Sequence, residues 1–367
     1  MAGQTEEFLV KLERIRTMMR GKGLFGCYLK RQDNFAWLTC GGVNYVAAGE
    51  TGNCGLLVTE DGLYAVTNNI EGPRMRDEEG LEKLGFEILQ GIWHDREFEE
   101  RTLRELCKNR PWARDYGPET IQGAVQALRF SLLPGEIERY QKGGKLVSRI
   151  VEESAAELRP GHTEWDGVSR MAKRAADEGI EPLSLFCAAD DRICLYRHAI
   201  SVGASIRERV QIGGNFKYKG LVIGLTRYVN FAPVSESLER QYRDNVEIGS
   251  RMIEATVPGA DYQTPLLAGK KAYERLGYGE EFDKHHQGGP IGYMARDFRV
   301  DFAQKGKIQP NQAFCWNPTI TGTKSEDTVI ATADGPLFIT GPCLFPVIET
   351  EIAGRLFLRS TILEKRS

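Results

Sequence analysis

The pattern of apolar and polar positions divides the chain into a shorter amino-terminal part and a longer carboxy-terminal part. In the first part, apolar residues recur at helical spacing over 8–19, and the glycines at 21–23 end this predicted helix. Residues 80–89 predict a short helix that leads into a strand. Apolar runs predict further strands at 24–29, 35–40, 55–60 and 63–68, the last two joined by a hairpin turn at Asp61-Gly62. This mixture predicts a small α/β domain.

The pattern changes at Pro134, where a long amphipathic helix begins. Thr163 is predicted to cap the next helix, with Asp166 three residues later as its capping-box partner. Strands follow at 208–232, then helices at 236–256 and 262–276, then strands at 312–320, 326–333 and 336–340. The repeated order of two helices and a set of strands predicts two similar α/β halves around a shared cleft. The predicted domains are residues 1–127 and 128–367.

Composition restricts the class of protein. The chain has 367 residues with 51 acidic and 48 basic side chains, a balance that argues against a dedicated nucleic-acid or membrane-surface binder. No apolar run approaches the roughly 18 residues of a membrane span, and the first residues show no secretory signal. The eight cysteines are scattered without a CxxC motif, which is typical of reduced thiols. We therefore expect a cytoplasmic protein without a nucleic-acid or membrane partner.

Four segments carry a resemblance to a known superfamily. They are GGNFKYKGLVIGLTR (213–227), HHQGGPIGY (285–293), WNP (316–318) and KSEDTVIATADGPLFIT (324–340). In this order they resemble the pita-bread superfamily of creatinase, aminopeptidase P, prolidase and methionine aminopeptidase. Residues 1–127 resemble the small domain of creatinase and prolidase. The resemblance implies a pita-bread fold with pseudo-twofold halves, and a homodimer in which the small domain of one subunit covers the other's active site. Candidates for this lid are Trp37, Asn69, Glu71, Arg74, Trp93 and His94.

The metal ligands of the superfamily are mostly missing. Its metallopeptidases hold two divalent ions with two Asp, one His and two Glu, and these ions lower the pKa of a bridging water. The resemblance places four of these five ligands on Gly213, Gly224, Gly289 and Asn317, and only the last carboxylate remains, as Glu326. Glycine offers no side-chain ligand. The sequence therefore predicts no dinuclear metal site, no cofactor and doubtful peptidase activity.

Creatinase, a branch of the superfamily that works without metal, supplies roles for the remaining residues. By this resemblance His198 is the general base and acid, and imidazole suits that role because it titrates near neutral pH. Glu326 is the second catalytic candidate, which orients the substrate or polarises water. Thr226 stands where creatinase has a further carboxylate, so creatine itself is not the expected substrate, but Thr226 is expected to line the pocket.

Arginines and histidines complete the candidate pocket. Arg197 and Arg296 are predicted anchors for a substrate carboxylate, which arginine binds in a bidentate fork. The alternative is that these arginines pair with nearby Asp and Glu side chains, and Arg227 is expected to be structural in this way. The neighbours His285 and His286 are expected to point to opposite faces of an extended segment. A mononuclear metal on this pair is an open alternative, and Asn317 is a further pocket candidate.

These residues lead to three hypotheses about function. The preferred one is a metal-independent, creatinase-like hydrolase of a C–N bond in a small metabolite that carries a carboxylate. The second is a catalytically inactive pita-bread homologue that binds a peptide or a protein. The third is a metallopeptidase of the aminopeptidase P or Xaa-Pro dipeptidase type.

Overall fold

The computed structural model describes residues 2–365 and divides the chain into two compact units, one ending at Glu136 and the next beginning at Ile137. Both units mix helices and strands, which confirms the α/β class. The division falls within the first turn of a long helix, nine residues after the predicted domain boundary at 127. No helix within the described range has the length and apolar character needed to cross a membrane.

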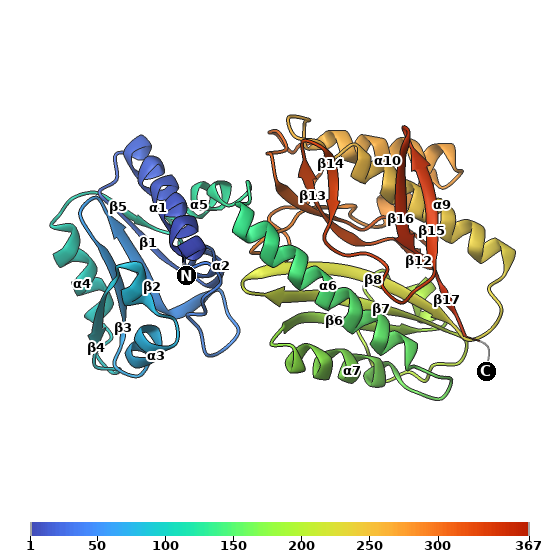
Figure 1. The fold of residues 1–367 in the computed structure, drawn as a ribbon, viewed down its shortest axis with the longest axis horizontal. Coiled ribbons are helices and arrows are strands. Elements are labelled where there is room, and N and C mark those ends of the chain that lie inside the picture. Colours follow the sequence, from blue (N-terminus) through green and yellow to red (C-terminus); the bar gives the residue numbers. More distant parts are fainter. Residues whose placement is uncertain (1, 366–367) are drawn as a thin grey trace. The chain divides into compact units, whose positions relative to one another are not determined.

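The amino-terminal unit is built on a five-stranded sheet in the order β4-β3-β2-β1-β5 (Figure 1). The predicted hairpin at Asp61-Gly62 is confirmed, because β2 and β3 pair antiparallel on either side of it. The strands are β1 (Gly26–Arg31), β2 (Thr51–Thr59), β3 (Leu63–Asn68), β4 (Glu87–Gly91) and β5 (Trp112–Arg114). The helices are α1 (Ala2–Lys22), α2 (Gln32–Leu38), α3 (Gly72–Asp77), the 3-10 helix η1 (Leu81–Leu84), α4 (Phe98–Cys107) and α5 (Gln122–Leu128).

One predicted strand in this unit is wrong. Residues 35–40 fall largely in helix α2 rather than in the sheet. Five consecutive residues of α2, from Asn34 to Leu38, are buried, and a short run that is buried on all sides shows neither helical nor strand periodicity. The Asp115 carboxylate also accepts hydrogen bonds from the backbone N–H of Lys30 and Arg31 and from the Asn34 amide. These bonds anchor the chain where β1 ends and α2 begins.

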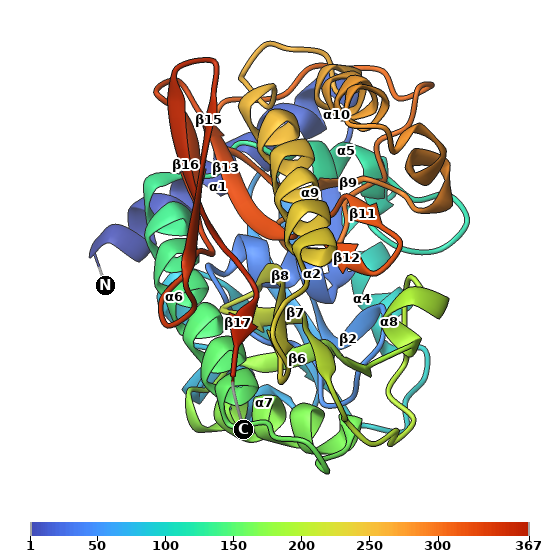
Figure 2. The same ribbon diagram turned by 90° about the vertical axis from the view of Figure 1, so that its right-hand side faces the viewer.

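The carboxy-terminal unit repeats one arrangement of two helices and a sheet. In the first half, α6 (Pro134–Ala156) and α7 (Glu164–Asp177) accompany a sheet of order β17-β8-β7-β6, and Figure 2 shows both helices beside it. Tyr140 of α6 donates a hydrogen bond to the Val222 carbonyl of β8, so this helix is bonded directly to the sheet. The elements of this half are β6 (Glu181–Ala189), α8 (Arg192–Leu195), β7 (Arg209–Tyr218), β8 (Leu221–Asn230) and β17 (Leu363–Glu364).

The second half packs α9 (Glu236–Glu254) and α10 (Gln263–Arg275) against each other and a sheet of order β14-β13-β10-β9. A core of buried apolar side chains, including Ile248, Tyr273, Phe314 and Trp316, joins the helices to this sheet. The remaining elements are η2 (Gly279–Lys284), β9 (Gly288–Pro290), β10 (Gln312–Trp316), β11 (Thr319–Ile320), β12 (Thr323–Lys324), β13 (Asp327–Thr332), β14 (Gly335–Phe338), β15 (Val347–Ile352) and β16 (Arg355–Ser360). The predicted duplication is thus confirmed.

The predicted cap of α7 is present as a complete capping box. Thr163 Oγ1 accepts a hydrogen bond from the Asp166 N–H at 3.3 Å, and Asp166 Oδ2 accepts one from the Thr163 N–H at 2.8 Å. We expect Thr163→Ala to lower the free energy of unfolding by about 1 kcal/mol, because the Asp166 N–H loses its side-chain acceptor. Urea denaturation measures this change. Ser169→Ala on the exposed side of the same helix is the control, and an equal loss there would contradict the assignment.

Candidate functional site

A cavity of about 180 Å³ in the carboxy-terminal unit brings together residues from both halves. His198 follows α8, and Gly214 and Asn215 lie on β7 of the first half. His286 precedes β9, Asn317 follows β10, and the loop after β9 adds two arginines. The lining residues are Ser184, Phe186, His198, Gly214, Asn215, His286, Ala295, Arg296, Arg299, Asn317, Lys324 and Glu326. Five predicted site residues therefore meet in one cavity: His198, His286, Arg296, Asn317 and Glu326.

Glu326 is the carboxylate of this cavity and is ionised at neutral pH. Its Oε2 lies 2.8 Å from Lys324 Nζ and accepts a 2.6 Å hydrogen bond from Thr226 Oγ1. Burial alone would raise the pKa of Glu326, but Lys324 and Thr226 outweigh it and hold the pKa at about 2. Thr226, which was predicted to line the pocket, thus contacts Glu326 but does not line the cavity.

The thiol of Cys315, next to Glu326, is no nucleophile at neutral pH, because burial raises its pKa to about 12.

Three histidines lie together at one side of the cavity. His198 Nε2 is 3.2 Å from His285 Nε2, and the rings of His285 and His286 are stacked with centroids 4.4 Å apart. The expectation that His285 and His286 point to opposite faces is wrong, because their rings are stacked. Of these two neighbours, only His286 borders the cavity. Burial lowers the pKa of His285 to about 2 and that of His286 to about 4, and it also lowers the pKa of His198. All three rings are therefore uncharged at neutral pH.

Two arginines give the cavity an excess of positive charge. Arg296 Nη1 donates to the backbone carbonyls of Gly289 and Cys315 at 3.0 and 2.7 Å, and it forms no ion pair within residues 2–365. Arg299 is exposed and forms neither a hydrogen bond nor an ion pair with any described residue. The alternative of pairing with nearby acids is therefore wrong for Arg296. With Lys324 neutralised by Glu326, two cations remain available to an anion.

Two other arginines lie outside the cavity. Arg197, a predicted anion anchor, instead bonds the Glu281 carboxylate at 2.6 Å and Thr321 Oγ1 at 2.7 Å. Arg197 directly precedes His198 in the sequence but points away from the cavity, because the chain turns at these two residues. Arg227 is buried between Glu152 and Asp327, as its predicted structural role requires.

Two of the missing ligand positions, Gly213 and Gly289, have no room for a side chain. A Cβ at Gly213 would lie 2.2 Å from the Leu225 carbonyl oxygen, and one at Gly289 would lie 2.5 Å from that of Phe298. At Gly224 the nearest atoms are side-chain ends 3.0 Å away. Glu326 is the one carboxylate among the residues that line the cavity. The two-metal centre of the superfamily therefore does not fit this site.

Sequence reasoning missed several lining residues. Lys324 and Arg299 carry charge, while Asn215, Ser184 and Phe186 add polar and aromatic surface. The sequence does contain an indication that Lys324 lines the cavity. Lys324 stands two residues before Glu326 on an extended segment, and side chains at that spacing lie on the same face. Ser184 and Phe186 left no such signal, because the pairing of β6 with β7 places them here.

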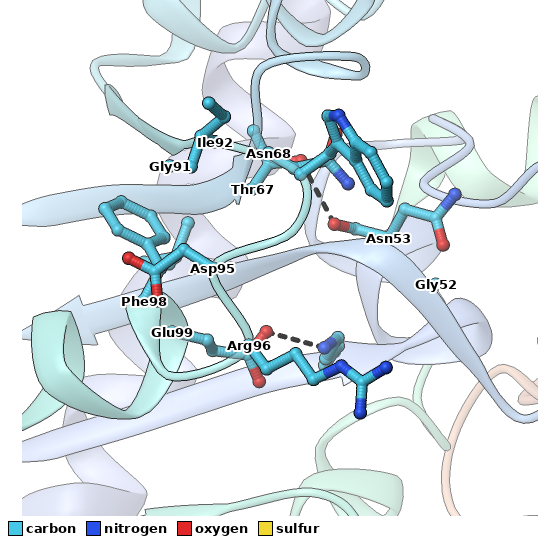
Figure 3. Close-up of a pocket in the computed structure, with 13 residues that line it drawn as sticks. Gly52, Asn53, Thr67, Asn68, Gly91, Ile92, Asp95, Arg96, Phe98 and Glu99 are labelled. Atoms are coloured by element: carbon cyan, nitrogen blue, oxygen red, sulfur yellow. Dashed lines mark hydrogen bonds and ion pairs between the residues drawn. The ribbon is translucent and has the colours of Figure 1, made fainter.

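The amino-terminal unit has a separate hollow of about 210 Å³ at the ends of β3 and β4 (Figure 3). Lys30 and Glu99 form an ion pair in it, and Trp93, which is 64% exposed, lies at its rim. Of the lid candidates, Trp37 is completely buried and Arg74 is paired with Glu71. The role of Asn69, Trp93 and His94 as a lid in a homodimer stays a prediction.

Comparison with known proteins places this fold and cavity in a family. The sequence profile of metallopeptidase family M24 matches residues 138–333, which is more than half of the chain. The chain belongs to metallopeptidase family M24. The match covers the cavity and confirms the resemblance to the creatinase and aminopeptidase P superfamily. No curated protein matches the chain by sequence.

Solved structures of M24-type fold resemble this member over almost its whole length. An Xaa-Pro dipeptidase from Bacillus anthracis is 18% identical with a TM-score of 0.73, covering 92% of this chain and 98% of its own. Dipeptidase PepE from Mycobacterium ulcerans is 15% identical with a TM-score of 0.75, covering 98% and 99%. Prolidase from Pyrococcus furiosus is 17% identical with a TM-score of 0.72, covering 89% and 99%. These similarities confirm the pita-bread fold.

The comparisons correct the preferred hypothesis about function. A metal-independent, creatinase-like hydrolase of a small metabolite is wrong, because the matching family is one of metallopeptidases and the similar structures are dipeptidases and prolidases. The family assigns the chain to the peptidase type of hydrolase. The third hypothesis, of the aminopeptidase P or Xaa-Pro dipeptidase type, is the one these findings favour.

Proposed function

We propose that this M24 member hydrolyses short peptides that carry a free terminal carboxylate. The observation that supports this most directly is a pair of arginines, Arg296 and Arg299, in the cavity with His198 and Glu326. Neither arginine has a carboxylate partner among residues 2–365. Arginine binds a carboxylate through charge-assisted hydrogen bonds. In hydrolysis, water adds across the amide C–N bond and yields a carboxylic acid and an amine.

The cavity also offers an acceptor for a peptide N–H group. Asn317 is 3% exposed, and its Oδ1 has no hydrogen-bond partner among the described residues. A buried acceptor without a partner is costly, and a donor from a bound ligand would remove that cost. An anion site and an N–H acceptor in one cavity match the two ends of a short peptide better than they match a simple carboxylic acid.

The acid–base groups of the cavity have distinct states at neutral pH. Glu326 is ionised and His198 is neutral, so Glu326 supplies fixed negative charge while His198 supplies a lone pair. Lys324, held by Glu326, is a donor available to the carbonyl oxygen of the scissile bond. No step is assigned to the two-metal centre of the family, because its ligands are not present.

The test is an assay of the full chain against Xaa-Pro and other dipeptides and against their C-terminal amides. We expect cleavage of the free acids and at least about tenfold weaker kcat/KM for the amides, because one charge-assisted hydrogen bond contributes about 1.5–3 kcal/mol. Cleavage of acids and amides at equal rates would contradict the carboxylate site. Binding of the acids by calorimetry without any cleavage would instead support the second hypothesis, an inactive peptide binder, which the loss of four ligand positions favours.

Replacing Arg299 tests the anion site separately. We expect Arg299→Gln to raise the KM for a dipeptide about tenfold and to leave kcat nearly unchanged, because this exposed side chain contacts the carboxylate before and during the reaction. Steady-state kinetics measure both constants. Arg243→Gln on an exposed turn of α9 is the matched control, and an equal rise in KM there would show that the effect is not local.

A further inference from the structure

We propose that His198, His285 and His286 form a binding site for a single transition-metal dication of the zinc class. Each imidazole offers one nitrogen, and these three nitrogens lie within 4.8 Å of one another. The ligands come from two separate parts of the fold, the loop after α8 and the segment between η2 and β9. This site is distinct from the family's two-metal centre, whose ligand positions are mostly glycine here.

The spacing of two of these nitrogens fits tetrahedral coordination. Two nitrogens bound to zinc at about 2.0–2.1 Å in a tetrahedron are roughly 3.3 Å apart. The Nε2 atoms of His198 and His285 are 3.2 Å apart. The ring centroids of His198 and His286 are 5.8 Å apart, so a small rotation of the exposed His198 side chain brings the third ligand into range.

The cluster contains buried nitrogens that the protein leaves without partners. Nδ1 of His285 and Nδ1 of His286 accept or donate no hydrogen bond in the described chain, although both atoms are buried. Most buried polar side-chain atoms in proteins are satisfied, so such a pair in one cluster calls for a ligand or solvent. The ion would take Nε2 of His285, so Nδ1 of His286 is the unpartnered nitrogen that it can satisfy.

The backbone that carries two of the ligands is held in place by Gln287. Its Nε2 donates to the carbonyls of Phe282 and His285 at 2.8 and 2.7 Å, and its Oε1 accepts from the Tyr273 hydroxyl at 3.2 Å. Gln287 is buried, so these bonds fix the segment before any ion binds. A preformed site loses less conformational entropy on binding than a flexible one.

The ligand type and the neighbouring charges select the ion. Imidazole suits Zn²⁺, Co²⁺, Ni²⁺ and Cu²⁺, whereas Mg²⁺ and Ca²⁺ prefer oxygen ligands. Arg296 and Arg299 repel any dication. The site therefore retains only an ion that forms strong bonds to the imidazole nitrogens, not one attracted by charge alone. Three protein ligands beside an open cavity leave a further coordination position for water or substrate, as in catalytic zinc sites.

The test measures metal binding directly on tag-free, full-length protein stripped with a chelator. After dialysis against Zn²⁺, elemental analysis should give about one zinc per chain, and Co²⁺ should give the visible absorption of a tetrahedral site. Mg²⁺ should not compete. A stoichiometry below about one tenth, or equal retention of Mg²⁺, would overturn the proposal. The inference goes beyond the proposed function. An ion on Nε2 of His198 occupies the lone pair that this ring offers in the metal-free cavity, and the zinc readout does not depend on any peptidase activity.

Variants separate the cluster from incidental histidine binding. His198→Ala and His286→Ala should each lower the zinc affinity at least tenfold, while His94→Ala and His162→Ala, the two histidines outside the cluster, should not. Circular dichroism confirms that each variant is folded, and His198 is exposed, so its replacement leaves the core intact. Unchanged zinc affinity in both cluster variants, or an equal loss in the two controls, would overturn the assignment.

Discussion

Replacing Arg227 with methionine is expected to lower the free energy of unfolding of the carboxy-terminal unit by about 3–5 kcal/mol, because two buried carboxylates each lose a charged partner. Arg227 is 1% exposed, and its Nε donates to Glu152 Oε1 at 2.8 Å. Its Nη2 is 3.0 Å from Asp327 Oδ1, an ion-pair contact without the alignment of a hydrogen bond. Its Nη1 donates to the Thr226 carbonyl at 3.0 Å.

The other partners of Glu152 and Asp327 explain why the loss of Arg227 should destabilise several elements of the unit. Glu152 Oε2 also accepts from the N–H groups of Cys343, Leu344 and Phe345, so it ties α6 to the segment before β15. Asp327 also accepts from Arg359 Nε at 2.9 Å, which ties β13 to β16. The network therefore joins elements from both halves, and Arg227 on β8 is the group between the two acids.

The network should also make the free energy of unfolding depend on pH in the acid range. Burial would raise the pKa of Glu152, but Arg227 and the N–H groups outweigh it and hold the pKa at about 2. A folded pKa below the unfolded value gives stability that is present above the unfolded pKa and is lost as pH falls toward about 2. In Arg227→Met this acid dependence should weaken, because Glu152 loses the cation that contributes most to lowering its pKa and keeps only its hydrogen-bond donors.

Urea denaturation across this pH range measures both effects on the full-length protein. Arg243→Met, which removes an exposed ion pair with Glu239, should change stability by less than about 0.5 kcal/mol. If Arg227→Met matched this control, or kept the full acid dependence, the structural role of the network would be refuted.

Restoring an aspartate at position 213 is expected to destabilise the protein by about 3 kcal/mol or more rather than to rebuild a metal centre. The Cβ of Gly213→Asp would lie 2.2 Å from the Leu225 carbonyl oxygen and 2.9 Å from the Thr226 Cα. These are backbone atoms of β8, which pairs with β7 at this point, so no side chain can move aside. The strands would have to separate.

The control is Gly341→Asp in the same unit, where a Cβ would meet nothing within 4 Å. It should cost far less stability, and neither variant should bind two metal ions by elemental analysis. A Gly213→Asp variant as stable as the parent, or one that binds a pair of ions, would show that the strands retain room for the ligand.

The helices and strands with strong periodicity could be predicted, and a short buried segment could not. The pattern located α6, α7, α9 and α10, and Thr163 marked the start of α7 because capping is a local interaction. Residues 35–40 were mistaken for a strand because burial on all sides removes the periodicity on which prediction depends. The start of α2 is also hydrogen-bonded to Asp115, which lies far along the chain and could not be recognised as a partner from the local sequence.

The candidate site was predictable only where a side chain could be matched to a motif. His198, His286, Arg296, Asn317 and Glu326 lie in one cavity as expected. Arg197 does not, because nothing local distinguishes a side chain that faces the cavity from one that pairs with an acid 84 residues later.

The sequence by itself determined the α/β class and the duplicated halves, because periodicity is a local property. The loss of the family's metal ligands stays a prediction from the resemblance. Only the tertiary structure decided which groups meet. It stacked His285 on His286 beside His198, placed Lys324 against Glu326 and left Arg299 without an acidic partner in the described part of the chain. The physical reason is that charge pairing and ligand geometry depend on distances across separate strands and loops, and these distances exist only once the two halves have packed.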